Sequence, residues 1–344
     1  MELPRVVVVG REILENTGEI LNDLETGRNC LVISGPNVRQ IVETRLGASL
    51  KNSGFDFRWE VGGASTFAEV ERIAQLAREE RSDFLIGVGG GRSIDIAKLA
   101  SFTCKIPFAS IPTSASHDGI ASPFGSVKGL ERPYSVVARP PIAVIADTDL
   151  ISKAPKKLLI SGCGDLISKK TAVKDWELSN AKTGEYFGRY SANLALLSAN
   201  MIMEDAEIIS SISSEGISVV VEALISSGVA AGIAGSSRPC SGSEHLFSHA
   251  MDIVAPGKGM HGEKCGMGTI LMSKLHGMDY GKIRESLQII GAPTKGSEIA
   301  ATGDEIVKAL VLARSIRKER YTILDEAKLS EESARRLAQD VGVI

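Results

Sequence analysis

Short runs of β-branched and other apolar residues alternate with amphipathic stretches over the first 150 residues of the chain. The runs have the length of buried strands, and the stretches between them repeat apolar positions at helical spacing. This alternation is typical of a parallel β-sheet covered by helices. The expected strands are Val6–Val9, Asn29–Ser34, Asp56–Val61, Asp83–Val88, Phe108–Ile111 and Ala143–Ala146. The expected helices are Glu12–Leu24, Val38–Ser53, Thr66–Glu80 and Ile94–Thr103.

The pattern changes near residue 150. Beyond it no segment has the pattern of a strand, and long helical patterns follow one another. The expected helices are Gly164–Asn180, Tyr186–Glu204, Ala206–Ser211, Glu215–Ala231, Gly242–Val254, Lys264–His276, Tyr280–Ile290, Gly303–Leu312 and Glu331–Asp340. The sequence therefore predicts a Rossmann-like α/β domain with a parallel sheet at 1–150 and an all-α domain at 151–344.

One stretch of the first domain combines three features that accompany anion binding. The strand ending at Val88 runs into Gly89–Gly91, and Ser93 can cap the helix that follows. Glycines let backbone N–H groups approach a pyrophosphate, and a helix N-terminus adds about half a positive charge. A nucleotide is the favoured occupant, although a tight turn without a ligand would use the same glycines. Asp95, in the first helical turn, would crowd a phosphate unless it faces another group.

A second polar loop follows the next strand. Residues 111–119 read Ile-Pro-Thr-Ser-Ala-Ser-His-Asp-Gly, with small hydroxyl residues directly after the apolar run. Ligands of parallel sheets lie beyond the carboxyl ends of the strands. We therefore expect both loops at one edge of the sheet and around one ligand.

Four of the five histidines lie between residues 245 and 276. His245 and His249 share one face of an expected helix, and His261 follows in a loop. Histidine pairs at this spacing bind divalent metals, and a carboxylate such as Asp165 completes a three-ligand site with an open position. Spacing alone pairs His245 with His249. The structural alternatives are histidines that pack on a helix face and Asp165 as a helix N-cap.

Composition narrows the class of protein. The 344 residues are 43% hydrophobic and 24% charged, enough for a large core in two domains. A net charge of −3 provides no basic surface for nucleic acid or an anionic membrane. Five scattered cysteines without a C-x-x-C pair favour a reducing compartment. The N-terminus lacks the charged-then-apolar layout of a signal peptide, and Val6–Val9 is too short to span a bilayer. We expect a cytoplasmic homo-oligomer with a small-molecule substrate, no nucleic-acid partner and no stable membrane insertion.

Four motifs together resemble those of the archaeal glycerol-1-phosphate dehydrogenases, in the superfamily of iron-containing alcohol dehydrogenases and dehydroquinate synthases. They are Gly-Gly-Gly-Arg-Ser-Ile-Asp at 89–95, Pro-Thr-Ser-Ala-Ser-His-Asp-Gly-Ile-Ala-Ser-Pro at 112–123, Gly-Cys-Gly-Asp-Leu-Ile-Ser-Lys at 162–169 and Gly-Ser-Glu-His-Leu-Phe-Ser-His at 242–249. The resemblance covers nearly the whole chain. It implies a dehydroquinate synthase-like fold and NAD(P)-dependent interconversion of dihydroxyacetone phosphate and sn-glycerol 1-phosphate, for archaeal membrane lipids. It also implies one zinc ion per subunit.

The resemblance assigns roles to individual residues. It places zinc on Asp165, His245 and His261. This ligand set differs from the pair of His245 and His249 that spacing alone suggests. Substrate would contact Asp118, Asp165 and His249, with Asp118 and His249 as catalytic residues that can relay a proton. The cofactor-binding positions would be Gly89, Gly90, Gly91, Arg92, Ser93, Ile94, Asp95, Thr113, Ser114, Ala115, Ser116 and Ser122.

Two features of the sequence refine the expected metal and cofactor. Iron-dependent relatives carry a histidine four residues after the metal aspartate, where this chain has Lys169, so three-ligand zinc is favoured over four-ligand iron. The turn after the second strand has Asn37 and Arg39 in place of an acidic residue that would repel a 2′-phosphate. We therefore predict that both NAD and NADP are used, with NADPH at least as good as NADH.

Several readings remain open at this level. A zinc-dependent glycerol dehydrogenase would share the fold and the metal but bind no phosphate. A dehydroquinate synthase-like lyase would use NAD without net redox, and a regulatory nucleotide-binding protein would need no metal set. Lys169, Lys258 and Lys264 are all candidates for the substrate phosphate, and the sequence does not choose among them.

Overall fold

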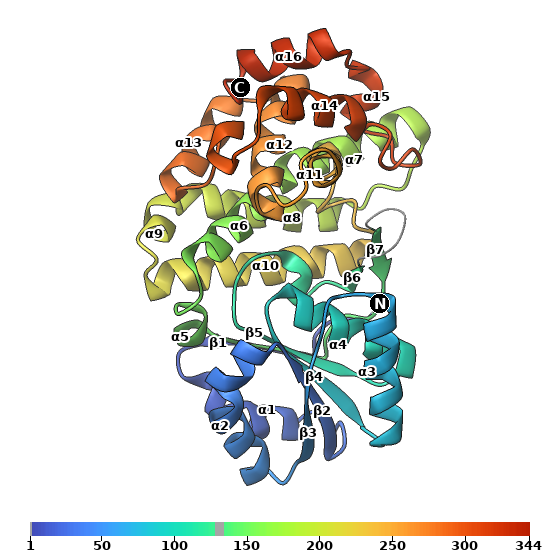
Figure 1. Cartoon of the computed structure of the whole chain (residues 1–344), viewed down its shortest axis with the longest axis vertical. Helices are drawn as coiled ribbons and strands as arrows, with labels where there is room; N and C mark the ends of the chain where they lie inside the picture. The colour runs from blue at the N-terminus through green and yellow to red at the C-terminus, as the bar shows by residue number, and fades with distance from the viewer. Residues whose placement is uncertain (1, 128–133) are drawn as a thin grey trace. The chain divides into compact units, whose positions relative to one another are not determined.

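The computed structural model describes residues 2–127 and 134–344. The chain divides into two compact units, Met1–Pro155 and Lys156–Ile344 (Figure 1). The first is built on a parallel sheet and the second is helical, which confirms the predicted fold class.

The sheet of the first unit has six parallel strands in the order β1-β8-β5-β4-β2-β3. All six expected strands are present, with ends that differ from the prediction by no more than a residue. They are β1 (Val6–Gly10), β2 (Asn29–Ser34), β3 (Asp56–Val61), β4 (Phe84–Gly89), β5 (Phe108–Pro112) and β8 (Ala143–Asp147). In the register, Ser34 pairs with Val88 and Gly89 pairs with Pro112. The polar turns after β2, β4 and β5 therefore begin at the same edge of the sheet.

Helices cover the sheet of this unit. They are α1 (Thr17–Asn22), α2 (Pro36–Asn52), α3 (Phe67–Glu79), α4 (Gly91–Cys104) and α5 (Thr148–Ile151). The expected helix Glu12–Leu24 is divided into a 3-10 helix, Ile13–Asn16, and α1. Apolar residues of α1 and α2 form one core with alternate residues of the strands, among them Val32 and Ile86.

Helix α4 begins earlier than its sequence predicts. Its N-cap is Gly90 in an extended conformation, and no side chain caps the first turn. The expected cap Ser93 is wrong, because it lies inside that turn. The glycine backbone enters the helix without a side-chain acceptor, so the first N–H groups keep their capacity to bind an anion. Helix and strand also lie unusually close, since a Cβ on Gly87 would lie 2.8 Å from Ala97 Cβ.

A small hairpin next to α4 was not predicted. Strands β6 (Phe124–Val127) and β7 (Tyr134–Val137) form an antiparallel pair. Each is only four residues long, too short for a clear alternation of apolar and polar positions. The hairpin packs on α4 through Gly125, where a Cβ would lie 3.0 Å from Leu99 Cγ.

The second unit consists of helices, and residues 156–344 contain no strand. Its helices are α6 (Lys156–Ile167), α7 (Lys169–Thr183), α8 (Arg189–Glu204), α9 (Ala206–Ser210), α10 (Ser214–Ala234), α11 (Ser243–Val254), α12 (His261–Leu275), α13 (Tyr280–Ile290), α14 (Gly303–Ala313), α15 (Ile323–Ala327) and α16 (Glu331–Asp340). A 3-10 helix, Gly296–Ile299, precedes α14. Among the described residues, α10 alone is long and apolar enough to cross a membrane, and 56% of that stretch is buried within the protein. Burial of this extent is typical of a core helix.

The expected helix Gly164–Asn180 is two helices, α6 and α7, which meet at Ser168. Asp165 therefore lies in the last turn of α6, and the interpretation of this residue as an N-cap is wrong. Glycine near Asp165 suggested a helix start, but its role is packing. A Cβ on Gly164 would lie 2.2 Å from the carbonyl oxygen of Gly262 in α12, and a Cβ on Gly262 would lie 1.7 Å from the carbonyl oxygen of Ser161. Only glycine at both positions lets α6 and α12 cross at this distance.

This crossing yields a first prediction. Gly164→Ala places a methyl group against the backbone of α12, which cannot move aside as a flexible side chain would. We expect a loss of about 2–4 kcal/mol in the free energy of unfolding, the upper range for overpacking. Thermal unfolding measures it. The control is Gly303→Ala at the start of α14, where the nearest atom to the new Cβ is 3.7 Å away. Equal melting temperatures for the two variants would contradict a tight crossing.

Candidate functional site

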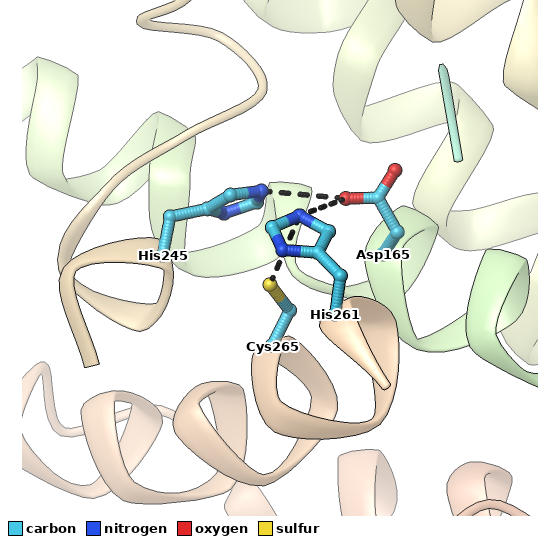
Figure 2. Close-up of side chains that lie close together, drawn as sticks. All are labelled: Asp165, His245, His261 and Cys265. Atoms are coloured by element: carbon cyan, nitrogen blue, oxygen red, sulfur yellow. Dashed lines mark hydrogen bonds and ion pairs between the residues drawn. The ribbon is translucent and has the colours of Figure 1, made fainter. Parts of the chain in front are cut away.

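Three helices of the second unit bring four potential metal ligands together. Asp165 comes from α6, His245 from α11, and His261 and Cys265 from α12, with their side chains turned toward one another (Figure 2). One ligand atom from each lies within 4.8 Å of the other three. Asp165 Oδ1 is 3.3 Å from His245 Nε2 and 3.9 Å from His261 Nε2. Cys265 Sγ is 3.6 Å from His261 Nε2.

The ionisable groups of this cluster shift one another's pKa values. Burial raises the pKa of Asp165, but Lys169 and His245 outweigh it and hold the pKa well below its ordinary value. Burial likewise raises the pKa of the Cys265 thiol, and the neighbouring imidazoles lower it to about 6. By contrast, burial raises the pKa of Cys163 to about 12. The cluster combines carboxylate, thiol and imidazole groups, the donor types that hold divalent transition metals.

Buried carboxylates fix the orientation of His245. Glu244 Oε1 accepts hydrogen bonds from His245 Nδ1 at 2.8 Å and from the Gly242 N–H at 2.6 Å, and its Oε2 accepts one from Thr171 Oγ1. This leaves His245 Nε2 directed at Asp165. A carboxylate on the second nitrogen of a metal-ligating histidine is common, because it fixes the tautomer and raises the basicity of the ligand.

Asp175 in α7 holds the start of α11 from outside the cluster. Its Oδ2 accepts from the Ser243 N–H at 2.6 Å, while Oδ1 accepts from His276 Nε2 and from the Ile323 N–H. Sequence reasoning assigned no role to His276. The structure gives it a partner in Asp175 and places it in this support for α11.

His249 lies beside the cluster but is not among the residues whose ligand atoms converge. Its ring centre is 6.1 Å from that of His261, whereas the rings of His245 and His261 are 5.0 Å apart. Burial, and the charges of His261 and His245, hold the pKa of His249 well below its ordinary value. Burial and the neighbouring positive charges thus favour the neutral form of His249.

The first unit brings together the two loops that the sequence singled out. The Thr113 N–H donates to the carbonyl oxygen of Gly89 at 3.0 Å. A Cβ on Gly90 would lie 3.3 Å from Ser114 Oγ, and one on Gly91 would lie 1.8 Å from His117 Nε2. The glycine turn at 89–91 thus lies against the loop that begins at Thr113, whereas Ile94 and Asp95 are buried in α4. Ser122 lies further along the chain, where its Oγ accepts from the Phe124 N–H at 3.2 Å.

Two buried charged residues, Asp95 and Lys98, connect α4 to the neighbouring loops. Asp95 faces Lys98 Nζ at 3.3 Å and the Ser126 N–H at 3.2 Å, so it has partners away from the glycine turn. Lys98 Nζ also donates to the carbonyl oxygens of Gly119 at 2.7 Å and Phe124 at 2.6 Å. Burial lowers the pKa of Lys98, against the raising effect of Asp95. Lys98 therefore ties α4 to the loop in which Asp118 begins a 3-10 helix.

The three lysines considered for the substrate phosphate all have carboxylate partners. Lys169, fully buried, lies 3.0 Å from Asp165. Lys258 Nζ is 2.7 Å from Glu305, and Lys264 pairs with Asp252. Lys169 thus balances the charge of the candidate metal ligand, and none of the three is singled out for phosphate.

The whole chain is similar to curated enzymes. The glycerol-1-phosphate dehydrogenase (NAD(P)+) of Nitrosopumilus maritimus is 49% identical over 346 residues, spanning 100% of this chain and 97% of that protein. The protein of the same name from Pyrococcus furiosus is 47% identical over 344 residues, spanning 100% and 99%. The chain belongs to the glycerol-1-phosphate dehydrogenase family. This confirms the resemblance carried by the four motifs.

Other glycerol-1-phosphate dehydrogenases also match over nearly their full length, and more distant proteins share the fold. A sequence model described as iron-containing alcohol dehydrogenase matches residues 8–155. The crystal structure of glycerol dehydrogenase from Schizosaccharomyces pombe superposes with a TM-score of 0.83 at 21% identity, covering 99% of this chain and 89% of that one. That of an iron-containing alcohol dehydrogenase from Thermotoga maritima has a TM-score of 0.73 at 18% identity, covering 99% and 98%.

Sequence reasoning missed three residues of these sites. Cys265 follows His261 by four residues and shares its helix face in α12, but the sequence places His261 in a loop before the expected helix, which hides this pairing. Glu244 is adjacent to His245, but neighbours on a helix normally point in different directions. Lys98 had no signal, since a lysine in a helix is normally exposed.

Lys98 provides a second prediction. Lys98→Met keeps the length of the side chain but leaves Asp95 and two carbonyl oxygens without their donor. We expect a loss of about 3–5 kcal/mol in stability, as for a broken buried ion pair, together with weaker NADPH binding. Thermal unfolding and a fluorescence titration with NADPH measure the two effects.

Two further variants test whether these effects come from the buried charge of Lys98. Lys51→Met, at an exposed position of α2, should change neither quantity. Asp95→Asn added to Lys98→Met should recover part of the stability, because it removes the unpaired carboxylate. If Lys98→Met melted and bound NADPH like the wild type, the support assigned to Lys98 would be wrong.

Proposed function

We propose that this protein catalyses the reversible NAD(P)H-dependent reduction of dihydroxyacetone phosphate to sn-glycerol 1-phosphate, for the glycerophosphate backbone of archaeal membrane lipids. The observation that carries the proposal is the convergence of Asp165, His245 and His261 in a chain whose whole length matches glycerol-1-phosphate dehydrogenases.

We infer that Asp165, His245 and His261 hold zinc. The donor set combines nitrogen, oxygen and a neighbouring sulfur, which suits zinc, and Lys169 occupies the position of the histidine found in iron-dependent relatives. Zinc at this site would polarise the carbonyl of the substrate as a Lewis acid and stabilise the negative charge that develops on its oxygen. The His261 side chain is 40% exposed and Asp165 only 2%, so a substrate would approach from the His261 side.

The reaction also needs a proton for the product hydroxyl. A neutral imidazole such as that of His249 can donate a proton from one nitrogen and regain one on the other. We propose His249 and Asp118 as the residues that contact substrate and relay this proton. Lys98 would act indirectly, by holding the loop that carries Asp118.

The uncapped first turn of α4 would bind the cofactor pyrophosphate, with contacts from positions 89–95, 113–116 and 122. The start of α2, after β2, carries no acidic residue in its first turn. Arg92 comes close to this turn, with Nη2 3.7 Å from the position of a Cβ on Gly35. An arginine near the ribose, with no acidic residue beside it, can accommodate the 2′-phosphate of NADP. We propose that NADPH serves at least as well as NADH.

We also propose that the enzyme works in the cytoplasm as a homo-oligomer. All five cysteines are free thiols, as a reducing compartment would keep them. The net charge of −3 gives no reason to expect a nucleic-acid partner.

The direct test is substrate choice by the purified protein. We expect oxidation of NADPH and of NADH on addition of dihydroxyacetone phosphate, with sn-glycerol 1-phosphate as the only enantiomer formed. Glycerol as the preferred substrate would favour a glycerol dehydrogenase. Turnover of a substrate without a steady change in nicotinamide absorbance would favour a lyase of the dehydroquinate synthase type.

His249 supplies a further prediction. His249→Ala should keep its metal, because the ligand cluster does not include His249, and should bind cofactor normally. Turnover of dihydroxyacetone phosphate should fall roughly a hundredfold or more, as for a lost proton-transfer group. The measurement is metal content beside kcat and KM. Ile253→Ala, an exposed position on the same helix, is the control. Loss of metal in His249→Ala would return this residue to the ligand set, and unchanged turnover would make it structural.

A further inference from the structure

Cys265 stands out as a buried thiol that the proposed reaction does not use. It is fully buried in α12, one helical turn after His261, and its Sγ points at the same centre as the three proposed ligands (Figure 2). A buried cysteine often behaves as a small apolar residue. This one is instead surrounded by imidazole and carboxylate groups.

Two distances in the cluster match edges of a tetrahedral metal site. On a tetrahedral ion, nitrogen or oxygen ligands at about 2.0–2.1 Å lie about 3.3–3.4 Å apart, and such a nitrogen lies about 3.6 Å from a sulfur at about 2.3 Å. The distance from Asp165 Oδ1 to His245 Nε2 is 3.3 Å, and that from His261 Nε2 to Cys265 Sγ is 3.6 Å. The edge from Asp165 Oδ1 to His261 Nε2, 3.9 Å, is longer by a shift that a side chain can absorb.

From this geometry we propose that Cys265 Sγ is a fourth protein ligand of the metal in the substrate-free enzyme. The inference rests on the proposed metal centre and extends it. A thiolate ligand makes the site softer, so it binds zinc, cobalt and cadmium in preference to magnesium or manganese. Cys265 occupies the buried side of the cluster. The exposed side, at His261, is then left for a substrate oxygen, since catalytic zinc can expand to five ligands.

The test uses cobalt as a spectroscopic probe in the full-length protein without substrate. The protein is stripped with a chelator, its fold is checked by circular dichroism, and it is titrated with Co²⁺. Visible bands report a tetrahedral site, and a near-ultraviolet charge-transfer band reports a thiolate bound to cobalt. We expect both sets of bands in the wild type, saturating together at one equivalent of metal.

Two alanine variants show which cysteine gives rise to the charge-transfer band. Cys265→Ala should lack the charge-transfer band and bind cobalt at least about tenfold more weakly, since a direct ligand should contribute no less than an outer-shell partner does. Cys163→Ala is the matched control, because Cys163 is also buried, lies two residues before Asp165 and is outside the ligand cluster. It should retain the band.

The outcomes separate this inference from the proposed function. Cobalt binding with no charge-transfer band in the wild type, or a band that persists in Cys265→Ala, would overturn the role of Cys265 and leave the three-ligand centre intact. A wild type that takes up no cobalt at all would overturn the metal centre itself. The wild-type spectrum decides the first question even if Cys265→Ala fails to fold.

Discussion

The close crossing of α6 and α12 is the constraint on which the candidate metal centre depends. Gly164 and Gly262 let the two backbones meet where any Cβ would collide with a carbonyl oxygen, and the Gly262 N–H donates to Ser161 Oγ at 3.1 Å. Asp165 is the next residue of α6 and His261 precedes Gly262 in α12, so the crossing fixes the distance between these two side chains. The helices lose some intrinsic stability through glycine, which the packing must offset.

Buried charges then hold the functional side chains in place in each unit. In the first, Lys98 joins Asp95 in α4 to the carbonyl oxygens of Gly119 and Phe124. In the second, Lys169 lies against Asp165, and Glu244 holds His245. Groups of this kind cost desolvation free energy and are poor sources of stability, but they allow few alternative arrangements. Their place next to both candidate sites suits a role in orientation.

The sequence predicts the elements of this fold well where hydrophobic periodicity is strong. The six strands of the sheet are apolar runs bounded by polar turns, and each formed where expected. The hairpin of β6 and β7 was missed because its strands are short. The start of α6 at Lys156 was missed because Gly164 suggests a helix start, whereas tertiary packing against Gly262 keeps this glycine inside a helix. Local pattern cannot reveal a contact across about 100 residues of chain.

The candidate sites were likewise predicted only in part from the sequence. The glycine turn and its neighbouring loop follow from the rule that ligands lie at the carboxyl ends of parallel strands. Histidine spacing alone pairs His245 with His249, whereas the ligand atoms that converge are those of His245 and His261, a choice that came from family resemblance. Cys265 and Lys98 became visible only in three dimensions, because their partners come from other elements or from a helix whose start the sequence did not locate.

Metal content and turnover in Asp165→Asn test the central claim most directly. Asparagine keeps the size of the side chain but loses the charge that binds a cation. The substitution removes no N-cap, because Asp165 lies in the last turn of α6. We expect one zinc per chain and turnover of dihydroxyacetone phosphate in the wild type, and loss of most of both in the variant, because the metal loses its carboxylate ligand and that ligand's negative charge. Full zinc content together with full turnover in Asp165→Asn would contradict the account.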